Sequence, residues 1–408
     1  LIRTSPLHIA NHGDIAYYDV GRSASVVILE QDGGLALRTN GLPEALMEMS
    51  GTSPRFSGEF WLSPIAVIAR PAVENMLVVG FGGGVVIENV PASVHKVDVI
   101  ELEPLVIEAN RATRSLRKRD PLSDRRINVI TNDARGALAL TDKRYDAIVS
   151  QPSHPWTAGA SHLYTLEFMQ QARAHLTEGG VFVQWMNVNF VNEPLLRSLT
   201  ATLLATFENV RIYRPDPATL VFLASAAPFR LEQNVATTGV PLVYSPRQYS
   251  HVGINSAEDL VAALAVDEAG TRALARGAPL ITDEDNRIAT STVFELQRGL
   301  SAEAMGRLLA TYDPLRRADS FIYGEMRRQL AYDYIARRLI TLIPLDASIP
   351  DRLFAMGKLL GNSPESYAVR IQYSVVAGRH AEAGRIAREA VALDPDDGSY
   401  AWHYQSSP

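Results

Sequence analysis

The sequence predicts a doubly wound α/β domain that follows a small antiparallel β unit and precedes an α-helical tail. Between about residues 75 and 225, continuous apolar runs such as "NMLVVGF" and "KVDVIELE" alternate with helical stretches, which is typical of a parallel sheet covered by helices on both faces. Residues 1 to about 70 contain short runs broken by Gly and Asn, and the pattern from Ser301 onward is helical. We therefore expect an N-terminal β unit over 1–70, the α/β domain over 71–300 and the helical tail over 301–408.

The N-terminal unit is predicted from the runs "IAYYDV", "SVVILEQ" and "LALRTN", which are rich in Val, Ile, Tyr and Leu. The segment Asp32–Gly34 separates the last two runs and is a good signal for a tight turn. A helix is expected near Phe60–Ala69. Within the α/β domain, "VRIYRP" and "ATLVFLAS" predict an antiparallel pair at the edge of the sheet.

The composition is that of a globular protein without a strong charge bias. Of 408 residues, 47% are hydrophobic and 21% are charged, and the formal net charge is −6. Nucleic acid is therefore not an expected partner, because phosphate binding needs a basic face. We interpret the basic run Arg111–Asp120 as a solvent-exposed helix face and loop. The absence of cysteine excludes disulfides and thiolate metal sites and fits a reducing compartment.

No membrane span or signal peptide is expected within this chain, since no run of 18 apolar residues occurs. Because the chain begins at Leu1 rather than at Met, a fragment of a longer protein is one interpretation. The histidines form no H-x-x-x-H pair with a glutamate base, and no G-x-S-x-G elbow follows a strand. Neither metal catalysis nor a serine hydrolase is therefore predicted.

A glycine loop follows the first apolar strand of the α/β domain. Gly80, Gly82 and Gly84 lie between this strand and a predicted helix. Glycine lets a ligand approach the backbone closely, and a helix N-terminus favours an anion. The next strand ends at Glu101, 21 residues after Gly80, and an acid there suits the two hydroxyls of a ribose. These residues predict a nucleoside-binding site.

The glycine spacing departs from the dinucleotide pattern, because position 85 is valine rather than glycine. The spacing resembles that of the Rossmann-like, class I methyltransferase-like fold that binds S-adenosylmethionine. A third strand, "INVITND", ends in Asp133. Asp133 is a candidate to accept a hydrogen bond from an adenine amino group, and capping of the following helix is the alternative.

Taken together, these motifs resemble the spermidine/spermine synthase family of aminopropyltransferases, in particular its spermidine-synthase-like branch, which is often fused behind a membrane-spanning region. The matching stretches cover roughly residues 15 to 290 and are "LALRTNGLPEA", "MLVVGFGGGVVIENV", "VDVIELEPLVIEANR", "RINVITNDARGAL", "YDAIVSQPSHPWTAGASHLYTLEFM", "GGVFVQWM" and "LITDEDN". The resemblance implies an aminopropyl transfer from decarboxylated S-adenosylmethionine to a small-molecule amine, without a metal. It also implies a homodimer and a cytoplasmic location, as the cytoplasmic portion of a membrane protein in one interpretation.

The resemblance assigns cofactor binding to Gly80, Gly82, Gly84, Glu101 and Asp133. Family members carry a loop of the form D-S-x-D-P, whose first Asp removes a proton from the amine. In this chain that Asp aligns with Gln151 and the second Asp aligns with His154, while the usual Asp of the glycine loop is Gly83.

Because Gln151 and His154 replace the two aspartates of the loop, the residue that would remove the proton from the amine is not obvious. Neutral Gln151 cannot accept a proton, so His154 is the candidate base. A protonated histidine repels a cationic amine, and a loop histidine that hydrogen-bonds to backbone is the alternative. Three further candidates for substrate contact are Trp156, Tyr164 and Gln184, for which packing is the alternative interpretation.

Three functions stay open on the sequence alone. The preferred one is a spermidine-synthase-like transferase, and the alternatives are an S-adenosylmethionine-dependent methyltransferase and a non-catalytic binding module. The stretch "GRHAEAGRIAREAVALDPDD" (Gly378–Asp397), preceded by "SPESYAVRIQYSVVAG", resembles part of a tetratricopeptide repeat. An ordinary amphipathic helix would look the same. The helical tail is therefore a candidate for binding a protein partner.

Overall fold

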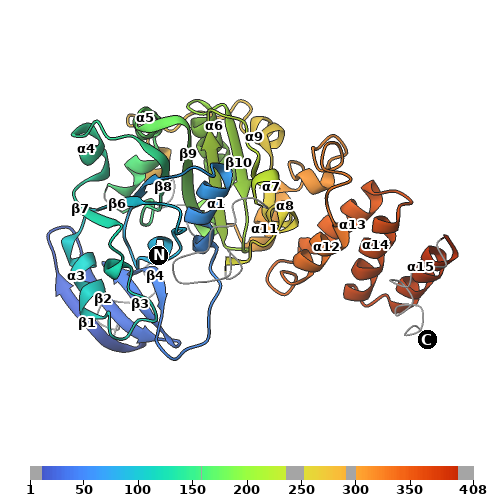
Figure 1. Ribbon diagram of the computed structural model, residues 1–408, viewed down its shortest axis with the longest axis horizontal. Helices are drawn as coiled ribbons and strands as arrows, with labels where there is room; N and C mark the ends of the chain where they lie inside the picture. The colour runs from blue at the N-terminus through green and yellow to red at the C-terminus, as the bar shows by residue number, and fades with distance from the viewer. Residues whose placement is uncertain (1–11, 158, 236–251, 291–299, 394–408) are drawn as a thin grey trace.

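The computed structural model describes residues 12–157, 159–235, 252–290 and 300–393. It contains a four-stranded antiparallel sheet, an eight-stranded mixed sheet and a C-terminal helical region. Figure 1 shows the small sheet at one end of the molecule, the large sheet with its helices in the middle and a row of helices at the other end. The predicted fold class is confirmed.

The small sheet is a meander of four strands that are neighbours in sequence. Its strands are β1 (Asp14–Val20), β2 (Ser25–Gln31), β3 (Gly34–Thr39) and β4 (Leu42–Glu48). Asp32 and Gly33 connect β2 to β3, both with positive φ, and Asn40 and Gly41 connect β3 to β4 in the same way. Two-residue turns of this kind match the twist of antiparallel strands. The turn predicted at Asp32–Gly34 is therefore present.

The large sheet has five parallel strands and an antiparallel edge. Its strands in spatial order are β12 (Leu264–Val266), β10 (Asn209–Tyr213), β11 (Thr219–Ser225), β9 (Leu176–Asn187), β8 (Tyr145–Ser150), β5 (Asn75–Val79), β6 (Lys96–Glu101) and β7 (Ile127–Thr131). The predicted antiparallel pair is β10 and β11. The strand order reverses between β5 and β8, and in sheets of this type such a switch point opens a crevice at the carboxyl ends of the strands.

Alternate residues of the central strands enter two separate hydrophobic cores. In β5, Met76 and Val78 pack on one face, whereas Leu77 and Val79 pack on the other. β8 and β11 are buried along their whole length. Burial on both faces explains why these strands appear in the sequence as continuous apolar runs.

Helices cover both faces of the large sheet. One face is covered, together with the small sheet, by α1 (Leu62–Ala69), α2 (Val85–Glu88), α3 (Pro104–Ala112), α7 (Leu231–Asn234) and α8 (Ala257–Ala263). The other face is covered by α4 (Ala134–Ala139), α5 (Leu166–Ala174), α6 (Glu193–Leu204), α9 (Glu268–Leu274) and α11 (Ala302–Leu309). Helix α1 matches the helix expected near Phe60–Ala69, and a 3₁₀ turn, η2 (Gly58–Trp61), precedes it.

The C-terminal region consists of α12 (Tyr332–Ile340), α13 (Ile349–Leu359), α14 (Pro364–Val376) and α15 (His380–Leu393). α12 packs on α8 of the α/β domain, and α14 packs between α13 and α15. The tetratricopeptide-like character of this tail is not confirmed. The Asp-Pro at the end of the predicted helix (394–395) lies outside the described residues. None of the helices in the described part of the chain is long and apolar enough to cross a membrane.

Candidate functional site

The switch point brings the glycine loop beside the residue that follows β8. The backbone N–H of Gly80 donates to the carbonyl of Ile100 (2.8 Å), and that of Gln151 donates to Val79 (3.0 Å). The Gln151 side chain donates to the Gly80 carbonyl at 2.8 Å. Gly80 has a φ of +91°, and a Cβ at this position would lie 2.8 Å from the Gln151 carbonyl oxygen. Only glycine permits this approach, so the two predicted residues are joined at the crevice.

Glu101 lies at the carboxyl end of β6, next to the same loop. One carboxylate oxygen accepts from the backbone N–H groups of Phe81 (2.9 Å) and Gly82 (3.4 Å), and the other accepts from Glu103 (3.0 Å). Burial raises the pKa of Glu101, although these hydrogen bonds act against the shift. The acid expected to meet a ribose therefore lies at the loop expected to meet the nucleoside.

The glycine loop is anchored from behind by Arg117. The guanidinium donates to the Gly83 carbonyl at 2.7 Å and also to the side chains of Asn110 and Glu88. Asn110 in turn donates to the Gly82 carbonyl at 3.0 Å. The Arg117 side chain is only 1% exposed, so the interpretation of the basic run 111–120 as a solvent-exposed face is wrong at this position. Gly84 completes the loop as the N-cap of α2.

Asp133 follows β7 at the same edge of the sheet and is exposed. Its side chain accepts from the backbone N–H of Gly136 at 2.8 Å and caps α4. The alternative capping role is therefore present, while contact with an adenine stays a prediction.

His154 is buried and forms part of an aromatic group. Its ring lies 4.9 Å from the rings of Trp156 and Phe190, which are 5.0 Å from each other. Among the described residues, Nδ1 of His154 has no hydrogen-bond partner, and it lies 3.6 Å from a carboxylate oxygen of Glu44. The alternative of a backbone hydrogen bond at this nitrogen is not seen. Trp156 is half-buried and packs against His154 and Phe190, while contact with a substrate stays a prediction.

Tyr164 and Gln184 are fully buried. Within the part of the chain that the structure describes, the hydroxyl of Tyr164 and Oε1 of Gln184 have no hydrogen-bond partner. Burial raises the pKa of Tyr164, and the charge of Glu44 adds to the shift. Tyr164 ends η4 (Ala160–Tyr164), and the next residue, Thr165, donates to Asp283 at 2.9 Å.

Glu44 is a residue that our sequence interpretation did not single out. It lies on β4 of the small sheet, and its Oε1 accepts from the hydroxyls of Ser153 (2.7 Å) and Thr39. Its charge acts on Glu59, Glu101 and Tyr164 and raises the pKa of each. Glu44 therefore contacts the loop that carries His154, and its charge also acts on Glu101 beside the glycine loop. It is present in the stretch "LALRTNGLPEA", which was the available signal.

Glu59 in η2 is the second acid that was missed. Burial is the main cause that raises its pKa to about 7, and the charges of Asp216 and Glu44 contribute to the same shift. Asp216 lies in the turn between β10 and β11 and accepts from the Gly58 backbone N–H at 2.6 Å. No pattern in the sequence distinguishes Glu59 from a surface glutamate.

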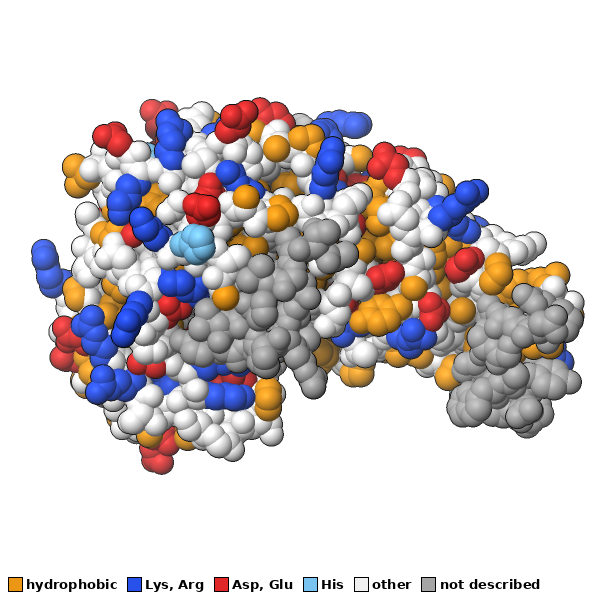
Figure 2. Space-filling view, viewed as in Figure 1, with side chains coloured by type: hydrophobic (Ala, Val, Ile, Leu, Met, Phe, Trp, Pro, Cys, Tyr) orange, Lys and Arg blue, Asp and Glu red, His pale blue; other side chains and the backbone are white. Residues whose placement is uncertain are grey.

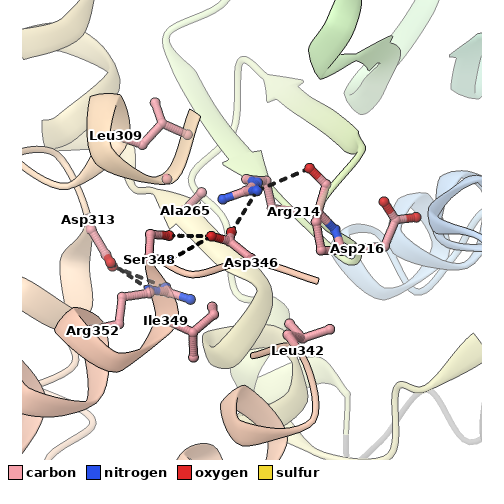
Figure 3. A pocket seen from close by; sticks show the side chains of 12 residues that line it. Arg214, Asp216, Ala265, Leu309, Asp313, Leu342, Asp346, Ser348, Ile349 and Arg352 are labelled. Carbon is pink, nitrogen blue, oxygen red and sulfur yellow. Dashed lines mark hydrogen bonds and ion pairs between the residues drawn. The ribbon is translucent and has the colours of Figure 1, made fainter. Parts of the chain in front are cut away.

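A separate pocket lies between the α/β domain and the C-terminal helices. Figure 3 shows Arg214 directed at Asp346 and Arg352 directed at Asp313 within it. The Arg214–Asp346 pair is 2.8 Å apart, and both side chains are largely buried. Because these charges are already paired, we interpret the pocket as part of the packing between the two regions.

The visible surface carries Lys and Arg side chains interspersed with Asp and Glu (Figure 2). The concentration of functional groups is instead at the carboxyl edge of the large sheet. A glycine loop and an acidic strand end at the switch point of a doubly wound sheet are features of Rossmann-like domains. The strand order, with an antiparallel edge formed by β11 and β10, agrees with this class of domain.

Residues 61–215 match the model of the spermine/spermidine synthase domain. This segment, which is less than half of the chain, is therefore similar to the spermine/spermidine synthase domain. It is 24% identical over 162 residues to polyamine aminopropyltransferase 1 of Pseudomonas aeruginosa, covering 39% of this chain and 56% of that protein. It is 25% identical over 154 residues to the polyamine aminopropyltransferase of a Ruegeria species, covering 37% of this chain and 54% of that protein. The chain thus spans about half the length of the curated relatives it matches.

Among solved structures, the chain is similar to a spermidine synthase in complex with the transition state analogue AdoDATO. The identity is 20% and the TM-score is 0.48, over 59% of this chain and 84% of that one. A spermidine synthase from Thermotoga maritima gives 19% identity and a TM-score of 0.47, over 60% of this chain and 84% of that one.

Proposed function

We propose that this protein transfers an aminopropyl group from decarboxylated S-adenosylmethionine to a small-molecule amine. The observation that carries the proposal is the contact of Glu101 with the glycine loop at the switch point, within a segment similar to the spermine/spermidine synthase domain. Glu101 would hold the ribose hydroxyls, and Gly80–Gly84 would allow the donor to approach the backbone. Asp133 would lie near the adenine.

In the proposed reaction, the nitrogen of the amine attacks the aminopropyl carbon next to the sulfonium. The new carbon–nitrogen bond forms as the carbon–sulfur bond breaks, and the electron pair of that bond goes to sulfur, which leaves methylthioadenosine. The amine must lose a proton to become nucleophilic. Gln151 cannot accept it. His154, which lies in the loop after β8 next to Glu44, would be the base.

Two experiments test the proposal. Calorimetry of the full chain with methylthioadenosine should give a saturable binding curve, and Glu101→Ala should remove it. Mass spectrometry of a reaction with decarboxylated S-adenosylmethionine and 1,4-diaminobutane should detect the aminopropylated amine. The absence of nucleoside binding at millimolar concentration would contradict the proposal, as would methylated products formed from S-adenosylmethionine with no aminopropylated product from the decarboxylated donor.

A cytoplasmic setting and a homodimer are also proposed, on the resemblance to spermidine synthases alone. Light scattering coupled to size-exclusion chromatography of the full chain would measure the oligomeric state. A single species with the mass of one chain across the micromolar range would contradict it.

A further inference from the structure

The stretch "LITDEDN" (280–286) has no role in the proposed function. We infer that Asp283, within this stretch, is a positioning residue whose carboxylate fixes η4 and the start of α5 against the first turn of α4. Both parts carry candidate site residues, because Asp133 caps α4 and Tyr164 ends η4. The inference rests on the proposed function and extends it to a residue that lies beyond the matched segment 61–215.

Asp283 holds α4 through Arg135. The two Nη atoms of Arg135 donate to the two carboxylate oxygens at 2.8 and 2.7 Å, and such a bidentate pair fixes the guanidinium in direction as well as in distance. The hydrogen bonds from Arg135 are also the main cause that lowers the pKa of Asp283 to about 2, so the carboxylate is ionised at neutral pH. Arg135 lies in the first turn of α4, which Asp133 caps. The start of α4 is therefore held by Asp283.

The same carboxylate holds the start of α5, the helix next to α4 (Figure 1). The hydroxyl of Thr165 donates to Oδ1 of Asp283 at 2.9 Å, and Nδ1 of His162 in η4 lies 3.4 Å from that oxygen. Thr165 occupies the N-cap position of α5 but makes no side-chain capping hydrogen bond, although threonine is among the residues suited to one. Its hydroxyl therefore serves the contact with Asp283 instead of the helix end.

The backbone around Asp283 is itself anchored to α5 and α6. The N–H of Leu166 donates to the Ile281 carbonyl at 2.8 Å, and the N–H of Asp283 donates to a carboxylate oxygen of Glu167 at 2.9 Å. The N–H of Ile281 donates to the Thr202 hydroxyl at 2.9 Å. Because its own backbone is held in this way, Asp283 is a fixed point to which Arg135 is attached.

The exposure of the ion pair favours a role in position over a role in stability. The side chains of Arg135 and Asp283 are 28% and 33% exposed, and ion pairs near the surface contribute little to the free energy of unfolding. What the contacts do provide is a fixed placement of η4 relative to α4. A nucleoside that binds beside Asp133 would then meet segments that need little further ordering, which favours binding. Asp283 would act through Arg135 and Thr165 and would not touch the donor.

The test is calorimetric titration of methylthioadenosine into the full chain, well below the unfolding temperature of each variant. Asp283→Asn and Arg135→Met should each weaken binding about tenfold, because the ligand must then order α4 and η4. The double variant should also lose about tenfold, since both single changes break the same contact. Asp285→Asn is the matched control, at an exposed acid of the same stretch that pairs with Arg287 at 2.7 Å, and should change the affinity less than about twofold.

Two variants of Thr165 test the contact with α5 while the ion pair stays in place. Thr165→Val removes the hydroxyl and should weaken methylthioadenosine binding about threefold. Thr165→Ser keeps the hydroxyl and should bind like the wild type. The unfolding temperature of every variant is measured without ligand, because a merely structural role would lower that temperature and leave the affinity of the folded protein unchanged. If Asp283→Asn does not fold, the comparison of the two Thr165 variants decides, and equal affinities overturn the inference.

The outcomes separate the inference from the proposed function. Methylthioadenosine binding that stays within about twofold of the wild type in both Asp283→Asn and Thr165→Val overturns the inference and leaves the proposed function standing. Additive losses in the double variant also overturn the inference, because Arg135 would then act on the nucleoside independently of Asp283. No binding by the wild type overturns the proposed function and the inference with it.

Discussion

The glycine loop and the loop from Gln151 to Thr157 lie side by side at the switch point but differ in how their polar groups are used. In the glycine loop, the N–H groups of residues 80–82 and the carbonyls of Gly82 and Gly83 all have partners within the chain. Around the other loop, several buried side-chain atoms have none in the described structure, namely Ser150 Oγ, His154 Nδ1, Tyr164 Oη, Gln184 Oε1 and Trp185 Nε1.

The two loops therefore differ in how many of their hydrogen-bonding groups are already paired within the chain. The glycine loop is held by hydrogen bonds within the chain, so a ligand that binds there would need to order it little. The region around the loop from Gln151 to Thr157 keeps buried hydrogen-bonding capacity at the cost of stability. The following four changes probe the comparison, beginning with the largest expected effect.

Replacing Arg117 should have the largest effect on stability. Arg117→Met leaves the buried Glu88 carboxylate with Arg119, 3.9 Å away, as its remaining ion-pair partner and should lower the free energy of unfolding by about 3 kcal/mol. Urea denaturation followed by circular dichroism measures this. The exposed Arg114→Met is the control and should be close to neutral. If Arg117→Met loses no more stability than Arg114→Met, the glycine loop does not depend on Arg117. Adding Glu88→Gln to Arg117→Met should restore part of the stability.

Substitution by alanine should lower the stability of the protein more at Gly80 than at Gly82. Gly80→Ala places a Cβ 2.8 Å from the Gln151 carbonyl oxygen at a positive φ and should cost about 2–3 kcal/mol. Gly82→Ala has the same sign of φ but no atom within 4 Å of the new Cβ, so it should cost only about 1 kcal/mol. Thermal unfolding of the pair measures the difference. Equal losses would show that close approach to Gln151 is not the constraint.

Removing the charge of Glu59 should stabilise the free protein. The folded-state pKa is raised to about 7, so the stability that neutral Glu59 provides is present at pH 4 and is lost as pH rises through about 7. Glu59→Gln should therefore gain about 1–2 kcal/mol at pH 8 and nothing at pH 4. Denaturation midpoints at the two pH values measure this. An equal gain in stability at both pH values would contradict the raised pKa of Glu59. The same gain in Glu178→Gln, at an exposed glutamate, would contradict it as well.

The smallest expected difference in stability is between phenylalanine variants of two buried tyrosines. The Tyr164 hydroxyl has no partner, so Tyr164→Phe should change stability by less than about 0.5 kcal/mol. The Tyr145 hydroxyl donates to Asp98 at 2.9 Å, so Tyr145→Phe should lose about 1.5–2 kcal/mol. Chemical denaturation of both variants measures the contrast. A substantial loss in Tyr164→Phe would mean that its hydroxyl already has a partner in the free protein.

Much of the fold could be predicted from local patterns. Continuous apolar runs indicated strands buried on both faces, and Asp32–Gly34 indicated its turn, because each signal depends on neighbouring residues alone. The capping of α4 by Asp133 was an alternative visible in the sequence for the same reason.

The remaining parts of the site depend on contacts between distant segments. Arg117 looks like the surface residues around it, and only its meeting with Glu88, 29 positions earlier, explains its burial. Glu44 reaches Ser153 across 109 positions. No local pattern in the sequence indicates that a glutamate of one sheet will reach the loop of another, so the sequence around Gln151 does not reveal Glu44 as its neighbour.

The position of the acids relative to the matched domain has a consequence for how this protein can diverge. Residues 61–215 hold the glycine loop, Glu101 and His154, whereas Glu44, Glu59 and Asp216 all lie outside that segment. A segment trimmed to the matched residues would keep the glycine loop and Glu101 and lose all three carboxylates. Substitutions in the small sheet could then change the charge beside the loop after β8 while the glycine loop and Glu101 stay untouched, so the two parts of the candidate site are free to evolve at different rates.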